Sequence, residues 1–225
     1  MLYHLARHLQ ATLPALNIVH YVSVRALCAL LTALSLSFIF GRRFIEASQK
    51  NFTAGPRPFL DHQNKKSTPT MGGLFILLVT TVSTLLWNNL AKSPVWIFLA
   101  CLAGFGTIGF FDDWAKIHAR VGLSARLKFF LEVCCASLIM SAWFYCSSPT
   151  TTLAIPFLKT LSPMLGLLLI PWGVFIIVGT SNAVNLADGL DGLAAGPLMS
   201  CYATFSAICY LAGHKYFANY LHIPF

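Results

Sequence analysis

Six apolar runs, each close to the length that crosses a lipid bilayer, constrain this chain more than any other feature. They lie near residues 22–40, 71–90, 94–111, 127–146, 164–178 and 193–212. A helix needs about 20 apolar residues to cross the hydrocarbon core, and it satisfies its own backbone hydrogen bonds there. The runs lack the alternation of a β-barrel. The sequence therefore predicts an all-α, polytopic transmembrane helix bundle, with residues 1–225 forming one integral membrane domain.

Composition supports a membrane protein and argues against nucleic acid as a partner. The chain is 57% hydrophobic and 10% charged, whereas soluble domains are about 25% charged. The net charge is +8, but the basic residues gather in two loops between apolar runs and do not form a nucleic-acid surface. The seven cysteines lie in or beside apolar runs without a C-x-x-C pair, which is typical of buried thiols and not of a disulfide framework or zinc site.

The two basic loops predict an orientation. The loops after the first and third runs hold ten of the fifteen basic residues: Arg42, Arg43, Lys50, Arg57, Lys65, Lys66, Lys116, Arg120, Arg126 and Lys128. The connections after the second and fourth runs hold one each, Lys92 and Lys159. The positive-inside rule places the basic loops in the cytoplasm and the N-terminus in the periplasm.

One pair of acids, Asp112 and Asp113, follows the third run. We expect both at the C-terminal end of the third helix, where the helix dipole disfavours carboxylates. A solvated acidic turn balanced by Lys116 and Arg120 is one interpretation. A Mg²⁺ site or a general base is the other, since Mg²⁺ takes one or two carboxylates and fills its other positions with water and phosphate.

The second pair, Asp188 and Asp191, lies in a polar segment before the sixth run. Asp191 is expected to cap the sixth helix, but capping explains one acid only. Besides the two acids, the segment 182–192 holds two asparagines and two glycines. Glycines allow close approach of a ligand to the backbone, and Asn and Asp side chains can recognise a base or sugar. The segment is therefore a candidate ligand site.

Three motifs together resemble a known family. They are T-P-T-M-G-G at 68–73, G-F-F-D-D at 109–113 and G-T-S-N-A-V-N-L-A-D-G-L-D-G-L-A at 179–194. The sequence resembles the polyprenyl-phosphate phospho-sugar transferases, and its first motif favours the muramoyl-pentapeptide branch over the N-acetylglucosamine branch. The resemblance implies that undecaprenyl phosphate attacks UDP-MurNAc-pentapeptide, giving lipid I and UMP with Mg²⁺, at the cytoplasmic face of the bacterial inner membrane. A homodimer is also compatible with this resemblance.

The resemblance also implies residue roles. Asp112 is the base that deprotonates the lipid phosphate, Asp113 positions the metal or the phosphates, and both are candidate metal ligands. The phosphates would be held by Lys116, Arg120 and Lys128. The nucleoside pocket would be lined by Asn182, Asn185, Leu186, Asp188, Gly189, Leu190 and Asp191, with Lys65 or Lys66 nearby. For the two lysines alone, positive-inside flanking of the second run is the competing interpretation.

The sequence departs from the family pattern in length. The family has about ten spans, a later F-M-G-D block whose aspartate binds the metal, and a histidine-bearing loop. None of these occurs in the 225 residues, so we expect the first six spans of the family fold and an incomplete metal site. A membrane protein that binds nucleotide or a partner without turnover, and a related N-acetylglucosamine-phosphate transferase, remain alternatives. A cation transporter is disfavoured because both acid pairs sit at span ends and not at mid-membrane.

Overall fold

The described part of the chain is helical. The computed structural model describes residues 1–51, 71–119, 121–153, 155, 162–188, 192–221 and 223. Within these residues no strand forms, and the one β-bridge joins Thr152 and Met164. The chain divides into two compact units, Met1–Ser148 and Pro149–Phe225, which are described separately. The single membrane domain over 1–225 stays a prediction.

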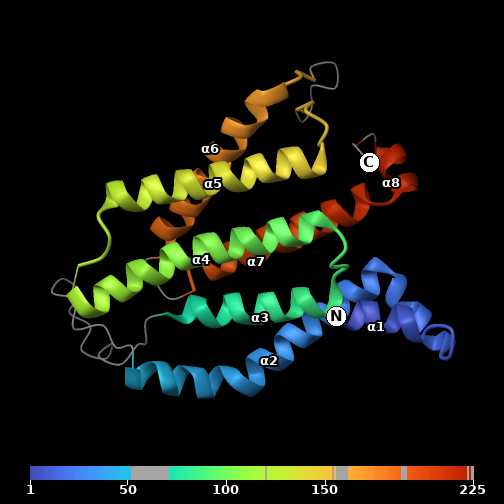
Figure 1. The fold of residues 1–225 in the computed structure, drawn as a ribbon, viewed down its shortest axis with the longest axis horizontal. Coiled ribbons are helices and arrows are strands. Elements are labelled where there is room, and N and C mark those ends of the chain that lie inside the picture. The colour runs from blue at the N-terminus through green and yellow to red at the C-terminus, as the bar shows by residue number, and fades with distance from the viewer. Residues whose placement is uncertain are drawn as a thin grey trace. The chain divides into compact units, whose positions relative to one another are not determined.

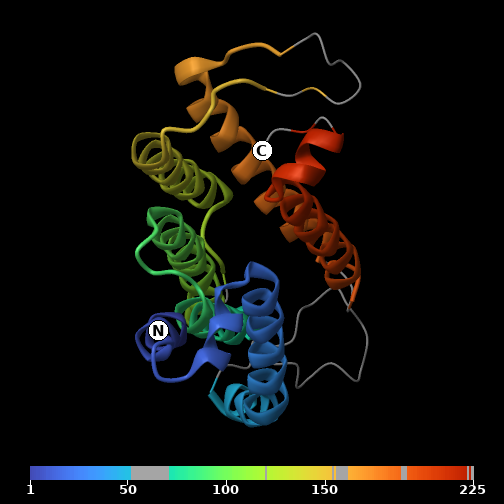
Figure 2. The same ribbon diagram turned by 90° about the vertical axis from the view of Figure 1, so that its right-hand side faces the viewer.

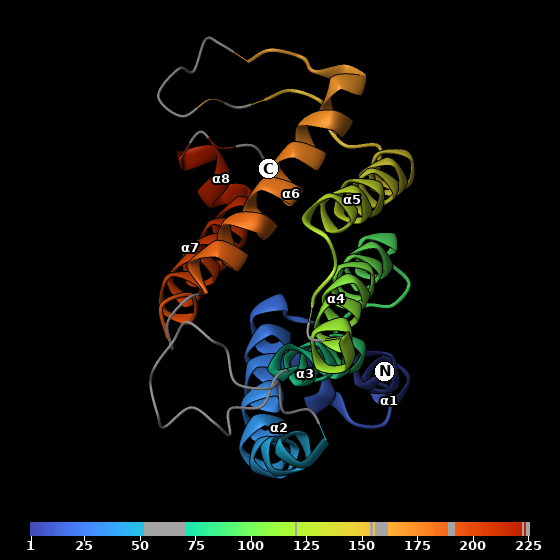
Figure 3. The same cartoon turned by 90° about the vertical axis from the view of Figure 1, so that its left-hand side faces the viewer.

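The first unit is a row of antiparallel helices. It contains α1 (Leu2–Leu9), η1 (Pro14–His20), α2 (Val22–Asn51), α3 (Gly72–Trp87), α4 (Ser93–Ala119) and α5 (Ala125–Ser147). From α2 onward each helix packs against the next (Figure 1), and the turned views show the same succession (Figure 2; Figure 3). In consequence α4 and α5 approach each other at the turn between Ala119 and Ala125.

The second unit contains η2 (Gly166–Leu168), α6 (Leu169–Ala187), α7 (Ala195–Ala212) and α8 (Lys215–Leu221). Pro171 and Pro197 each lie in the first turn of their helix, where the missing N–H has no intrahelical partner to lose. The N-cap of α7 is Ala194, without a side-chain cap. The expected capping residue, Asp191, lies outside the described residues.

Every predicted apolar run contains a helix, so the all-α class is confirmed. Five helices are long and apolar enough to cross a membrane, and α3 is shorter at 16 residues. At 1.5 Å per residue it is about 24 Å long, against the predicted run of 71–90. It ends early because Asn88 and Asn89 follow Trp87, and the Asn89 side chain accepts a hydrogen bond from the N–H of Ala91, which favours a turn over helix.

The N-terminal segment, for which no helix was expected, closes this short helix. The amino group of Met1 donates to the carbonyls of Leu85 and Leu86, and the N–H of Leu90 donates to His4 Nε2 at 3.1 Å. A positive charge on the last carbonyls of a helix complements its dipole. Polar groups at the end of α3 are thereby satisfied within the protein.

Three helices run further than their predicted spans. The first span was expected to end at residue 40, but α2 continues to Asn51. The third span was expected to end at residue 111, but α4 continues to Ala119. The fifth was expected to end at residue 178, but α6 continues to Ala187. In α6 the Thr180 hydroxyl donates to the Ile176 carbonyl at 2.7 Å, and Asn182 Nδ2 donates to the Val178 carbonyl at 2.9 Å. Polar side chains can stay helical because backbone carbonyls one turn earlier accept their hydrogen bonds.

Small residues on α4 allow close helix packing on two faces. A Cβ built on Gly104 would collide with the Cys135 sulfur of α5, and one built on Gly106 would lie 2.6 Å from Leu77 of α3. Close approach at small residues drives helix association in membranes, where lipid removes the hydrophobic driving force. Large apolar side chains elsewhere are exposed, for example Phe38 and Leu138, as befits surfaces that face lipid.

Candidate functional site

Four of the predicted site residues converge at the end of the α4–α5 hairpin. Lys116 Nζ lies 2.7 Å from Asp112 Oδ2 and 3.1 Å from Asp113 Oδ1, all on α4. Lys128 of α5 reaches the same Asp112 oxygen at 3.9 Å. We call these four residues the hairpin cluster. Two carboxylates face two ammonium groups, so the cluster is electrically balanced.

The turn between the helices completes the surroundings of Asp112. The backbone N–H of Leu123 donates to Asp112 Oδ1 at 2.9 Å. The next helix starts directly afterwards, with Ser124 as its N-cap accepting a hydrogen bond from the N–H of Leu127 at 3.4 Å. Both oxygens of Asp112 therefore have donors, one from a lysine and one from the turn. Sequence reasoning did not find Leu123, because a backbone donor leaves no signature in residue type.

The two acids differ in exposure. Asp112 is buried, with 10% of its side chain exposed, whereas 34% of the Asp113 side chain is exposed. Among the described residues, Asp113 Oδ2 takes no hydrogen bond or ion pair. Adjacent helical positions point about 100° apart, which explains why Asp112 faces α5 and Asp113 does not. Asp112 is held in place by the fold, whereas one oxygen of Asp113 has no donor among the residues that the structure describes.

The two acids of the hairpin cluster do not lie in the last turn of α4. Ala119 is the last residue of α4, about two turns beyond Asp112. The expectation that these acids occupy the C-terminal end of the third helix is wrong. The helix continues because the lysine at 116 pairs with acids three and four residues earlier, and such pairs stabilise helices. The unfavourable dipole term falls off within the last turn and does not govern Asp112.

A third acid, Glu132, lies one helical turn beyond Lys128 and is 3% exposed. Lys128, Glu132 and the fully buried Ala136 follow at intervals of four residues, which places them on one face of α5. Sequence reasoning missed this residue. The available signal was an acid inside an apolar run, since ionisable groups within membrane spans are rare and usually functional.

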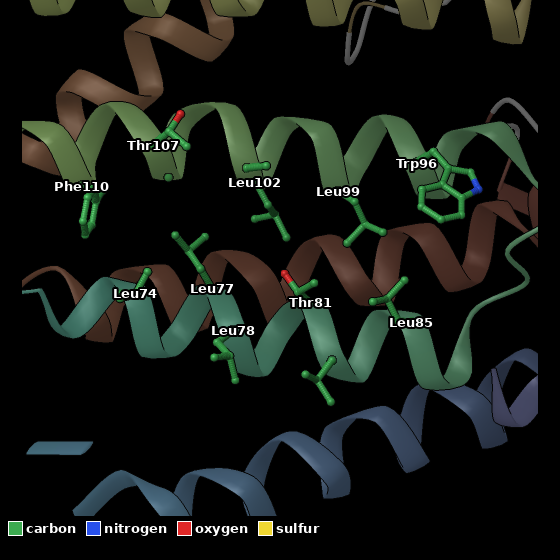
Figure 4. Close-up of a pocket in the computed structure, with 13 residues that line it drawn as sticks. Leu74, Leu77, Leu78, Thr81, Leu85, Trp96, Leu99, Leu102, Thr107 and Phe110 are labelled. Atoms are coloured by element: carbon green, nitrogen blue, oxygen red, sulfur yellow. The ribbon is translucent and has the colours of Figure 1, made fainter. Parts of the chain in front are cut away.

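An apolar groove runs along α3 and α4 on another face (Figure 4). It has a volume of about 540 Å³ and extends from Leu74 and Phe110 at one end to Leu85 and Trp96 at the other. Phe110 is two residues before Asp112, so the two side chains point about 200° apart around the helix. The groove therefore does not include Asp112, and α4 separates an apolar surface from the polar hairpin cluster.

The second predicted segment lies at the end of α6, in the other unit. Asn182, Asn185 and Leu186 are helical, and Asp188 is the C-cap, with its N–H donating to the Val184 carbonyl at 3.1 Å. Leu186 is 84% exposed, and Asn185 and Asp188 are also exposed. Positions three apart follow one face of a helix, so Asn182, Asn185 and Asp188 form one polar stripe. That this stripe meets the hairpin cluster stays a prediction.

Six predicted site residues lie outside the described residues: Lys65, Lys66, Arg120, Gly189, Leu190 and Asp191. Among the described residues, no three His, Cys, Asp or Glu side chains form a group able to hold a metal ion. Asp112 and Asp113 therefore offer a metal ion only two carboxylates, both on one helix. Their assignment as metal ligands stays a prediction.

Comparison with known proteins identifies relatives along the whole chain. The model of glycosyl transferase family 4 matches residues 95–223. A phospho-N-acetylmuramoyl-pentapeptide-transferase from Desulfosudis oleivorans is 43% identical over 235 residues, covering 100% of this chain and 65% of the relative. Proteins of the same name from Geobacter sp. strain M21 and Aquifex aeolicus are each 42% identical, covering 100% of this chain and 64% of theirs.

The chain thus spans about two thirds of the length of these curated relatives, 64–65%. The matched region includes α4, the turn after it and α5, and it continues through α6 to α7. Both predicted acid pairs lie inside it, and so does the hairpin cluster. With its apolar helices and this match, the chain is a multi-pass membrane protein that belongs to glycosyl transferase family 4.

Proposed function

We propose that this protein takes part in transferring phospho-N-acetylmuramoyl-pentapeptide from UDP-MurNAc-pentapeptide to undecaprenyl phosphate, releasing UMP and forming lipid I. The observation that carries the proposal is 40–43% identity over the whole chain to five enzymes bearing that transferase name. The hairpin cluster supports it, because a fixed carboxylate beside two amines suits chemistry on phosphates.

In this proposal Asp112 accepts the proton of the lipid phosphate. Its carboxylate is held from both sides, by Lys116 on Oδ2 and by the N–H of Leu123 on Oδ1. Fixed geometry is what a general base needs, because proton transfer requires a heavy-atom distance of about 2.6–3.2 Å. Lys116 and Lys128 would compensate charge on the phosphates as point charges.

Mg²⁺ is the proposed metal, and Asp113 fits it better than Asp112. Mg²⁺ binds through one or two carboxylates together with substrate phosphates and water. Asp113 has an oxygen without a partner in the described part of the chain, whereas both oxygens of Asp112 already have donors. When bound, the ion would neutralise charge on the diphosphate. Asp113 would hold it, and Asp112 would remain with the lysines.

The polar stripe of Asn182, Asn185 and Asp188 on α6 is the proposed nucleoside-binding surface. Amide and carboxylate groups can pair with the polar edge of a uracil base or with ribose hydroxyls. Gly189, Leu190, Asp191, Lys65 and Lys66 complete the proposed pocket by resemblance to the family. Because the substrates are a soluble nucleotide and a membrane lipid, we propose that both segments face the cytoplasmic side of the inner membrane.

The test is UMP release by the purified chain in lipid nanodiscs, with UDP-MurNAc-pentapeptide, undecaprenyl phosphate and Mg²⁺. We expect Asp112→Asn to lower kcat about 10²- to 10⁴-fold, as loss of a general base does, with little change in nucleotide affinity. The matched control is Glu46→Gln, which removes an exposed acid paired with Arg42 on α2 and should leave the rate unchanged. Saturable nucleotide binding without UMP release would support a binding protein instead, and preference for UDP-N-acetylglucosamine would support the related transferase.

A further inference from the structure

We propose that Gly122 and the backbone N–H of Leu123 are positioning groups that fix the orientation of the Asp112 carboxylate. Both lie in the turn between α4 and α5, neither in a helix. The functional consequence rests on the proposed role of Asp112, whereas the positioning itself is independent of it.

The first support is the way the carboxylate is held. Leu123 donates to Oδ1 at 2.9 Å and Lys116 reaches Oδ2 at 2.7 Å. With a separate donor on each oxygen, the carboxylate cannot rotate without losing one of them. Lys116 is on the same helix as Asp112 and has a flexible stem. The rigid donor is the backbone of the turn, so the turn determines which way the carboxylate faces.

The second support is the space at Gly122. A Cβ built there would lie 2.8 Å from Asp112 Oδ1, 3.1 Å from Lys116 Cε and 3.3 Å from Lys116 Cγ. The backbone of Gly122 is not in the left-handed region, unlike that of Gly166 and Gly192. A side chain at this position would therefore conflict with its neighbours in space, whereas the backbone conformation itself does not need glycine. Any side chain at this position must push the carboxylate away from the Leu123 N–H or displace the lysine.

Carboxylate footprinting of the full chain in nanodiscs tests the positioning. The probe is a water-soluble carbodiimide with a small amine, and mass spectrometry reads the labelling rates of Asp112 and, as internal reference, the exposed Glu46 of α2. We expect Gly122→Ala to raise the Asp112 rate several-fold relative to Glu46. The matched control is Gly109→Ala, because a Cβ there meets nothing within 4 Å. Unchanged Asp112 labelling in folded Gly122→Ala protein would overturn the proposal.

A second variant removes only the hydrogen bond. Replacing Leu123 with its α-hydroxy acid turns the amide into an ester, which keeps the side chain and deletes the N–H. We expect the same several-fold rise in Asp112 labelling, with helix content by circular dichroism unchanged. Labelling that stays at the wild-type rate would show that Leu123 does not hold the carboxylate.

Kinetics then separates positioning from the proposed function. We expect Gly122→Ala to lower kcat by about 10- to 100-fold, since misplacement by about 1 Å can cost that much, with the nucleotide KM unchanged. In an Asp112→Asn background, adding Gly122→Ala should not lower kcat any further. Fully additive losses would overturn the claim that Gly122 acts through Asp112. Faster labelling of Asp112 with an unchanged kcat would confirm the positioning and refute Asp112 as the base.

Discussion

At the scale of the residue, Asp112 is the side chain on which the site depends. Only 10% of this side chain is exposed, and a buried carboxylate is stable only with donors on its oxygens. Lys116, Lys128 and the N–H of Leu123 supply them from three different segments. The contacts that stabilise the buried carboxylate also fix its orientation, so stability and the proposed function depend on the same atoms.

The two lysines of the hairpin cluster should contribute unequally to stability. Lys116 contacts both acids, at 2.7 and 3.1 Å, whereas Lys128 contacts one at 3.9 Å. We expect Lys116→Gln to lower the free energy of unfolding by about 1–3 kcal/mol, because it leaves a buried acceptor without its donor. Lys128→Gln should cost less than about 1 kcal/mol, in the range of weak ion pairs.

Thermal unfolding of the two variants in the same detergent measures this difference. Arg42→Gln, which breaks an exposed pair with Glu46, serves as the surface control and should be close to wild type. A larger loss of stability for Lys128→Gln than for Lys116→Gln would contradict the conclusion that Lys116 makes the stronger contacts.

At the scale of the element, α4 organises the first unit. Its face at Gly104 packs on α5, its face at Gly106 packs on α3, and its last turns carry the hairpin cluster. In α4–α5 packing, the register that brings Gly104 to Cys135 also brings Asp112 to Lys128. Shifting either helix would therefore disturb the interface and the site together.

The Gly104–Cys135 contact gives a test at this scale. Gly104→Ala should destabilise the protein by about 1–3 kcal/mol, because the new methyl group overpacks the interface against the Cys135 sulfur. Adding Cys135→Ala removes the sulfur and should recover part of that loss, giving a coupling energy of about 1 kcal/mol or more in a double-mutant cycle.

The matched control for this cycle is Gly179→Ala in α6, where a Cβ meets nothing within 4 Å. It should be neutral or slightly stabilising, as alanine is in helices. Strictly additive effects of Gly104→Ala and Cys135→Ala, measured by reversible unfolding in detergent, would show that the two residues do not pack as described.

At the scale of the whole molecule, the arrangement of helix ends supports the proposed orientation. In the first unit, α2 and α4 end and α3 and α5 begin at the same end of the row (Figure 1). The basic residues described near these helix ends therefore lie toward one end of the row: Arg42, Arg43, Lys50, Lys116, Arg126 and Lys128. The positive-inside rule predicts that this side is cytoplasmic, which agrees with the proposed orientation.

Cysteine labelling from outside the cell tests this orientation. Single cysteines are placed in a cysteine-free background at Asn88, between α3 and α4, at the 71% exposed Val121, and at Asp188. A membrane-impermeant maleimide should label Asn88→Cys in intact spheroplasts, whereas Val121→Cys and Asp188→Cys should react only after permeabilisation. Labelling of Asp188→Cys from outside would separate the two acid pairs across the bilayer and refute a shared site.

The sequence by itself determined the class of fold and the chemistry available. Apolar runs of spanning length can only be helices in lipid, because unpaired backbone groups are too costly there, and a helix formed in each predicted run. Because the chain has only seven acidic residues, Asp112 and Asp113 were predicted as part of the candidate site. Helix ends were less predictable: α4 and α6 extend past the apolar runs because local side-chain pairs and back-bonds keep polar residues helical.

Only the tertiary structure decided what surrounds Asp112. Lys128 is sixteen positions away along the chain, and the antiparallel packing of α4 on α5 brings it to the carboxylate. The proposed role of Gly122 depends on the absence of a side chain. The proposed role of Leu123 depends on a backbone N–H, which any residue type except proline provides. Sequence patterns report which groups a chain possesses, whereas the packing of helices determines which of them meet, because contacts between distant positions depend on register and on the space left by small residues.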